Sequence, residues 1–176
     1  MSSTFTDLGS VLNPAANVQP TAGWGDQIRT NQDAIHKPPT VTLSNTTSLN
    51  CNGGSWFSQT FDVATIDSDS MHSTASNTER ITVNQEGLYL FGGYGKWTDT
   101  DTTGARGLRF RKGGVTVLED TLSNSLTGAL SVRHNLSTIE HLTTGQYVEC
   151  QAYWSGTSTN SINVTVDCVR VSGSTG

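Results

Sequence analysis

From Thr40 onward, short runs rich in β-branched and aromatic residues alternate with turns that contain glycine. The runs recur at roughly 8–12 residue intervals, a spacing that is typical of antiparallel sandwiches and barrels. A helix would instead need a longer run with a period of 3.6 residues. The predicted strands cover residues 41–44, 56–61, 79–83, 87–97, 106–111, 115–119, 130–142, 146–154 and 161–172.

Composition favours the same fold class. Ser and Thr together number 47 of the 176 residues and Gly adds 18, whereas only 14% of the residues are charged. Threonine suits strands and glycine suits turns, while long helices need more Ala, Leu, Glu and Lys. We therefore predict an all-β chain with a jelly-roll or sandwich architecture.

Charge and hydropathy exclude several partners. The net charge of −5 argues against nucleic acid, because a phosphate backbone calls for a basic protein surface. No apolar run approaches the roughly 18 residues of a membrane span, and residues 1–10 lack the basic and apolar regions of a secretory signal. We expect a protein made in the cytoplasm, with no membrane partner.

The residue types that carry catalysis or bind metals show no recognisable spacing. Three cysteines without a CxxC pair form neither a disulfide framework nor a zinc site, and Cys150 and Cys168 sit in strand-like runs as small buried hydrophobes. We predict no cofactor, no metal, no catalytic residue and no enzyme activity, while a pair between Cys51 and a histidine brought close in space stays open. The histidines are His36, His72, His134 and His141.

Residues 1–40 form a predicted N-terminal arm, separate from a β-domain at 41–176. All four prolines lie in this arm. Residues 21–35 are expected to form one short helix in which Trp24, Ile28 and Ile35 share a stripe. So short a helix is marginal alone in water, so we expect it to dock on its own domain, sister chains or another partner.

The alternation within two strands predicts self-association. In 87–94, Leu88 and Leu90 point to one side of the strand while Tyr89 and Phe91 point to the other, so both sides are apolar. In 146–154, Tyr147 and Tyr153 lie opposite a row of smaller apolar residues. We predict that copies of the chain cover the second face, although the N-terminal arm could cover it instead. The predicted interface residues are Tyr89, Phe91, Tyr147 and Tyr153.

The segment Gly87-Leu88-Tyr89-Leu90-Phe91, preceded by Ile81, resembles the central signature of the C1q/TNF-like jelly rolls. Phe61 and Asp67 resemble its upstream part, and residues 142–148 resemble the entry to a late strand of that family. The resemblance implies a ten-strand jelly roll, a compact homotrimer whose threefold axis faces the sheet with this strand, and in some members an apical calcium. The sequence departs from the signature at Ile81, His72 and Gly93, and in the length between Asp67 and Ile81.

The N-terminal segment is similar to the leading segments of small tailed-phage virion proteins, through Pro20, Trp24, Ile28-Arg29, Asn31 and Ile35. This resemblance implies a bacteriophage structural protein on the virion surface, made in the bacterial cytoplasm. The first hypothesis is a trimeric capsid decoration protein that grips the major capsid protein lattice, so that three weak arms act together. The expected virion-anchoring residues are Trp24, Ile28, Arg29 and Ile35.

The alternative hypothesis is a tail-tip or fibre module that contacts tail proteins and recognises a host surface glycan. Loops at 65–79, 98–106 and 155–161 would then carry specificity. Arg109 and Arg111 share one strand face, which is either solvated or in contact with an acidic lattice or polysaccharide. Asp99 and Asp101 begin like a calcium loop but lack its final glutamate, so a solvated turn is the competing interpretation. These four residues are the candidate outer-surface contacts.

Overall fold

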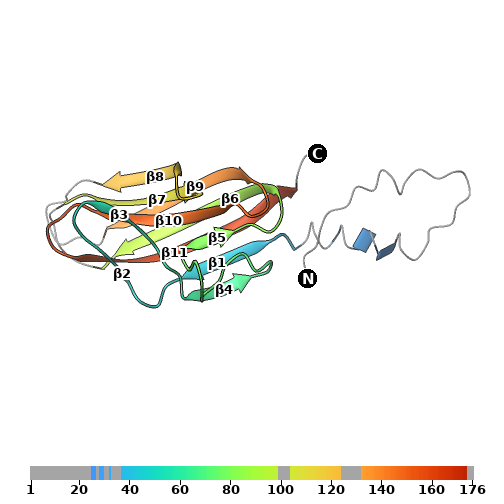
Figure 1. The fold of residues 1–176 in the computed structure, drawn as a ribbon, viewed down its shortest axis with the longest axis horizontal. Helices are drawn as coiled ribbons and strands as arrows, with labels where there is room; N and C mark the ends of the chain where they lie inside the picture. Colours follow the sequence, from blue (N-terminus) through green and yellow to red (C-terminus); the bar gives the residue numbers. More distant parts are fainter. Residues whose placement is uncertain are drawn as a thin grey trace, which may run out of the picture.

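The computed structural model of the chain is a sandwich of two antiparallel sheets (Figure 1). It describes Gly25, Asp26, Ile28, Arg29, Gln32 and residues 37–98, 104–123 and 132–173. The predicted all-β jelly-roll class is confirmed. The five described positions between residues 25 and 32 are helical, in agreement with the helix expected there.

Sheet A, as we name the larger sheet, has the strand order β4-β1-β11-β6-β9, and β2 pairs with β11 beside this path. The interior strand β6 lies between β11 and β9, and it carries the signature-like segment. The strands of sheet A are β1 (Thr40–Ser44), β2 (Leu49–Cys51), β4 (Val63–Asp67), β6 (Gly87–Trp97), β9 (Arg133–Leu142) and β11 (Asn160–Gly173).

Sheet B has the order β3-β10-β7-β8, and β5 pairs with β10 beside this path. Its strands are β3 (Ser55–Ser58), β5 (Arg80–Thr82), β7 (Arg106–Lys112), β8 (Thr116–Ser123) and β10 (Tyr147–Trp154). Strands β2 and β4 were not predicted. The first has three residues and the second buries no side chain fully, so neither shows the in-and-out alternation that marks a strand in a sequence.

The core fills the space between the inner faces of the two sheets. Phe91 of sheet A meets Phe110 of sheet B with ring centroids 5.9 Å apart. Further along the sandwich, Trp97 meets Trp154 at 6.3 Å. All four aromatic side chains are at most 1% exposed, so the rings of β6 tie the two sheets together.

The predicted interface role of Tyr89 and Phe91 is wrong. Both side chains are 0% exposed, because they point into the sandwich and not away from it. The Tyr89 hydroxyl donates a hydrogen bond to the Gln85 carbonyl at 2.7 Å, and burial raises the pKa of this phenol to about 12. The alternation of β6 was predicted correctly, but its two sides were exchanged.

Gly93 makes room for the aromatic contact between the sheets. A Cβ at this position would lie 2.8 Å from Cζ of the buried Phe110. The family-like signature has an aromatic residue here, and the structure explains the departure, since the Phe110 ring occupies the space that such a side chain would need.

Replacing Gly93 by alanine should lower the free energy of unfolding by about 1–3 kcal/mol, because the added methyl group overpacks the core. Gly92→Ala is the matched control, since its Cβ would meet nothing within 4 Å. Chemical denaturation of both variants, followed by circular dichroism, measures the difference. Equal stability of the two variants would contradict this account of the core.

His134 is the buried titratable group of β9. It is 4% exposed and its Nε2 lies 3.3 Å from the Ser123 hydroxyl. Burial, and then the positive charge of Arg106, lower its pKa below the ordinary value of 6.5.

The unfolded chain therefore binds a proton on His134 at a higher pH than the folded chain does. As the pH falls below about 6.5 toward the lowered value, the free energy of unfolding should decrease. His134→Gln should remove this part of the pH dependence in denaturation curves recorded between pH 7.5 and pH 5. An unchanged slope in the variant would assign the dependence to other groups.

Candidate functional site

The outer face of sheet A is apolar at its centre. Leu90 of β6 pairs with Val169 of β11 and with Ile139 of β9, and paired residues point to the same side of a sheet. Their side is opposite to the buried Phe91. We name four exposed residues of this side the sheet A apolar face: Ile66 (48% exposed), Leu90 (36%), Tyr94 (38%) and Ile139 (57%).

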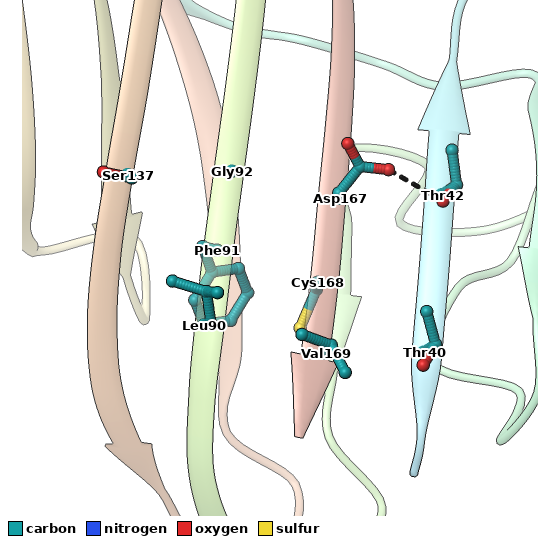
Figure 2. A pocket seen from close by; sticks show the side chains of 9 residues that line it. All are labelled: Thr40, Thr42, Leu90, Phe91, Gly92, Ser137, Asp167, Cys168 and Val169. Carbon is teal, nitrogen blue, oxygen red and sulfur yellow. Dashed lines mark hydrogen bonds between the residues drawn. The ribbon is translucent and has the colours of Figure 1, made fainter. Parts of the chain in front are cut away.

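A hollow of about 280 Å³ interrupts this face (Figure 2). Its centre is Gly92, which has no side chain and pairs with Asp167 on one side and Ser137 on the other. The Thr42 hydroxyl donates to Asp167 Oδ1 at 2.7 Å, which holds the carboxylate at the wall of the hollow. The face therefore presents a recess as well as projecting side chains, and such relief suits packing against another surface.

The outer face of sheet B is built differently, from charged and aromatic side chains. Arg109 and Arg111 project from it, while Leu108 and Phe110 between and beside them are 0% exposed, as the alternation predicted. The paired strand β10 contributes Gln151, and the edge strand β3 contributes the ring of Trp56. We name the following set the sheet B polar face: Trp56, Arg80, Arg109, Arg111, Glu149, Gln151 and Tyr153.

Two guanidinium groups of this face converge on one neutral oxygen. Arg109 donates to Gln151 Oε1 from Nε at 2.9 Å and from Nη2 at 2.7 Å, and Arg111 donates to the same oxygen at 3.4 Å. Burial, and then the charge of Arg111, lower the pKa of Arg109. Gln151 is only 5% exposed, so the pair is anchored on a rigid, nearly buried acceptor.

Tyr147 and Tyr153 also lie on this outer face, half-buried. The Arg80 guanidinium stacks 4.2 Å from the Tyr147 ring, and the Tyr153 ring lies 5.2 Å from that of Trp56. They are on the sheet opposite to the sheet A apolar face, so they cannot form one continuous interface with it. Their contribution to an interface stays a prediction.

The remaining predicted positions are only partly described. Ile28 is half-buried and Arg29 is exposed, with Arg29 Nη2 3.0 Å from Asp26 Oδ1. Trp24, Ile35, Asp99 and Asp101 lie outside the described residues, so the anchoring and calcium-loop hypotheses remain predictions there.

A second acidic loop, which begins at Asp67 at the end of β4, acts as a turn. Asp67 accepts hydrogen bonds from the backbone amides of Met71 at 2.8 Å and His72 at 3.1 Å, which closes the loop with its own carboxylate. Within residues 37–98, 104–123 and 132–173, no cluster of three metal-ligating side chains occurs. No helix in the described part is long and apolar enough to cross a membrane.

The three cysteines are buried free thiols, as was predicted for Cys150 and Cys168 from their strand positions. Burial raises the pKa of Cys51 to about 12 and raises the pKa values of Cys150 and Cys168 as well. A thiol needs a lowered pKa to act as a nucleophile at neutral pH, so these groups behave as core hydrophobes.

Solved structures share this architecture. The globular domain of zebrafish complement 1qA matches with a TM-score of 0.63 at 12% identity, over 78% of this chain and 100% of that one. Murine APRIL at pH 5.0 gives a TM-score of 0.55 at 11% identity, over 74% of this chain and 98% of that one. Eiger TNF from S. frugiperda gives a TM-score of 0.51 at 14% identity, over 80% of this chain and 97% of that one.

The chain therefore has a C1q/TNF-like jelly-roll fold, as the signature-like segment implied. No protein-family model and no curated protein sequence matches it. At identities of 11–14% the likeness establishes the fold alone.

The alternation in the sequence placed Arg109, Arg111, Tyr147 and Tyr153 on the outer sides of their strands, but it did not place Leu90 and Tyr94 there. Lys96 shares its side of β6 with Leu90 and Tyr94, and this charged residue was the available signal that their side is the outer one. The contact between Arg109 and Gln151 had no signal within either strand, because the two residues are 42 positions apart.

Proposed function

We propose that the chain is a bacteriophage virion structural protein, a homotrimeric capsid decoration protein rather than an enzyme. The observation that carries the self-association is the sheet A apolar face. Leu90, Tyr94 and Ile139 are exposed on the outer side of a sheet whose inner side is already packed as core. Burying this face against copies of the chain removes apolar surface from water.

The relief of the face supports contact with a similar surface. The hollow at Gly92 lies between projecting residues, Leu90 on one side and Tyr94 on the other along β6. Projections of one copy can enter the recess of another, as close packing at an interface requires. The trimeric state also follows what the C1q/TNF-like resemblance implies for the sheet that contains this strand.

Placement on the virion is supported by the N-terminal segment. The described residues Ile28 and Arg29 are helical and belong to the pattern shared with leading segments of phage virion proteins. A short helix of this kind is not stable by itself and gains order by docking on a partner. In this proposal the partner is the major capsid protein lattice, and three arms joined by one trimer bind with avidity.

A tail-tip or fibre module that binds a host glycan is the second candidate. It is favoured by the sheet B polar face, where arginine and aromatic side chains lie together on the side opposite to the apolar face. The number of copies per particle separates the two placements, since a head carries hundreds and a tail carries few.

Leu90→Asp should convert the trimer to a monomer, because assembly would bury an unpaired carboxylate in each copy. Val115→Asp is the matched control, since Val115 is 78% exposed and follows the end of β7 on the other sheet. Sedimentation velocity at several protein concentrations measures the state. A wild-type chain that sediments as a monomer, or a Leu90→Asp chain that stays trimeric, would refute the assembly.

Deleting residues 1–36 should leave a folded trimer that no longer binds phage heads assembled without this protein. The measurement is co-sedimentation with such heads, and electron microscopy then counts the copies bound. Val115→Asp in the full chain serves as the control and should bind as the unmodified chain does, since Val115 belongs to none of the predicted contact sites. Binding retained after the deletion would remove the anchoring role of the arm.

A further inference from the structure

Two neighbouring guanidinium groups of the sheet B polar face form no direct ion pair. Neither Arg109 nor Arg111 has a carboxylate within ion-pair distance among the described residues, whereas Arg80 and Lys112 on the same sheet are paired with Glu79 and Glu140. Asp120 pairs with Arg109 across the strands and acts on it electrostatically, and Glu149 is the cross-strand neighbour of Arg111, with its Oε1 3.7 Å from the Arg80 Nε. The side chain that both guanidinium groups contact directly is the neutral Gln151.

Both groups keep donors for a ligand. A guanidinium has five N–H donors. Arg109 uses two of its own on Gln151, and Arg111 uses one on Gln151 and one on the Gly114 carbonyl. The Arg111 Nε is buried, so the donors of Arg111 that remain for a ligand are the second N–H of Nη1 and the second N–H of Nη2. Fixed, half-buried guanidinium groups of this kind bind a carboxylate with little loss of side-chain entropy.

Aromatic surface lies directly beside the charge. The Arg109 guanidinium stacks 4.1 Å from the Trp56 ring, and the Trp56 and Tyr153 ring centroids are 5.2 Å apart. Tyr153 pairs with Gly107 across the strands, and the side chains of Trp56 and Leu122 fill the space over Gly107, since a Cβ there would lie 2.9 Å from each. Flat apolar rings next to a fixed cation match a ligand with a ring that has C–H faces and an acidic substituent.

We propose that the sheet B polar face binds an acidic saccharide, with a sugar carboxylate on Arg109 and Arg111 and the sugar ring against Trp56 and Tyr153. Aromatic surface distinguishes this ligand from an acidic peptide, and the net charge of −5 disfavours a long nucleic acid. All residues of the site come from one chain and lie on the sheet opposite to the apolar face. The site therefore does not depend on the proposed trimer.

The test titrates the full chain with trigalacturonate and follows the heat of binding by calorimetry. We expect saturable binding, weakened about tenfold or more by Arg109→Gln and by Arg111→Gln, since each removes charge-assisted hydrogen bonds. Arg29→Gln is the matched control, because it removes the same charge from an exposed residue outside the sandwich. It should bind as the unmodified chain does.

Two further probes define the ligand class. A neutral galactose trisaccharide, which lacks the carboxylate, and triglutamate, which lacks the sugar ring, should each bind at least about tenfold more weakly than trigalacturonate. Trp56→Ala should weaken binding of trigalacturonate and leave that of triglutamate unchanged. Arg109→Lys keeps the charge without the forked donors, and it provides a variant that folds if Arg109→Gln does not.

Several results would overturn the proposal. These are an absence of saturable binding, equal affinity for the neutral trisaccharide, equal affinity for triglutamate, and affinities unchanged by the arginine substitutions. Leu90→Asp separates this proposal from the assembly, because a monomer should keep the same affinity per chain. Loss of saccharide binding in that monomer would show that the site needs neighbouring subunits and would refute the single-chain site.

Discussion

The position of β6 between β11 and β9 determines which of its side chains form the core and which form the outer face of sheet A. This strand has a neighbour on each side, so it has no free edge. Its side chains alternate between the inside of the sandwich and the outside. Residues 89, 91, 93, 95 and 97 point inward, and Phe91 and Trp97 meet the rings of Phe110 and Trp154 in sheet B. The residues between them form the outer face, and several of these are apolar.

The outer faces of the two sheets are built differently. Sheet A exposes Leu90, Tyr94 and Ile139 around a hollow, an arrangement suited to contact with another protein surface. On the outside of sheet B, Arg109 stacks on Trp56 and is anchored by Gln151, and Arg80 stacks on Tyr147. The stems and rings of these residues cover part of the sheet while their polar ends reach outward, and Val117 and Leu122 of β8 remain exposed beside them.

Much of the fold was predictable because it depends on local patterns. Turn glycines and β-branched runs placed the long strands, and the alternation around Leu108 and Phe110 placed Arg109 and Arg111 outside. Cys150 and Cys168 were correctly expected to be buried. Strands β2 and β4 were missed, because their pairing is set by neighbours distant in the sequence and not by their own side chains.

The pattern of residues alone was enough to predict that β6 has two apolar sides, which residues share a side, and that the chain forms an antiparallel sandwich. It did not determine which side of β6 is the inner one, because a period of two residues is unchanged when the two faces are exchanged. Packing between the two sheets settles which side of β6 is the inner one. For example, the Phe110 ring of sheet B fills the space beside Gly93. The same contacts bury Tyr89 and Phe91 in the core and leave Leu90 and Tyr94 exposed on the outer face.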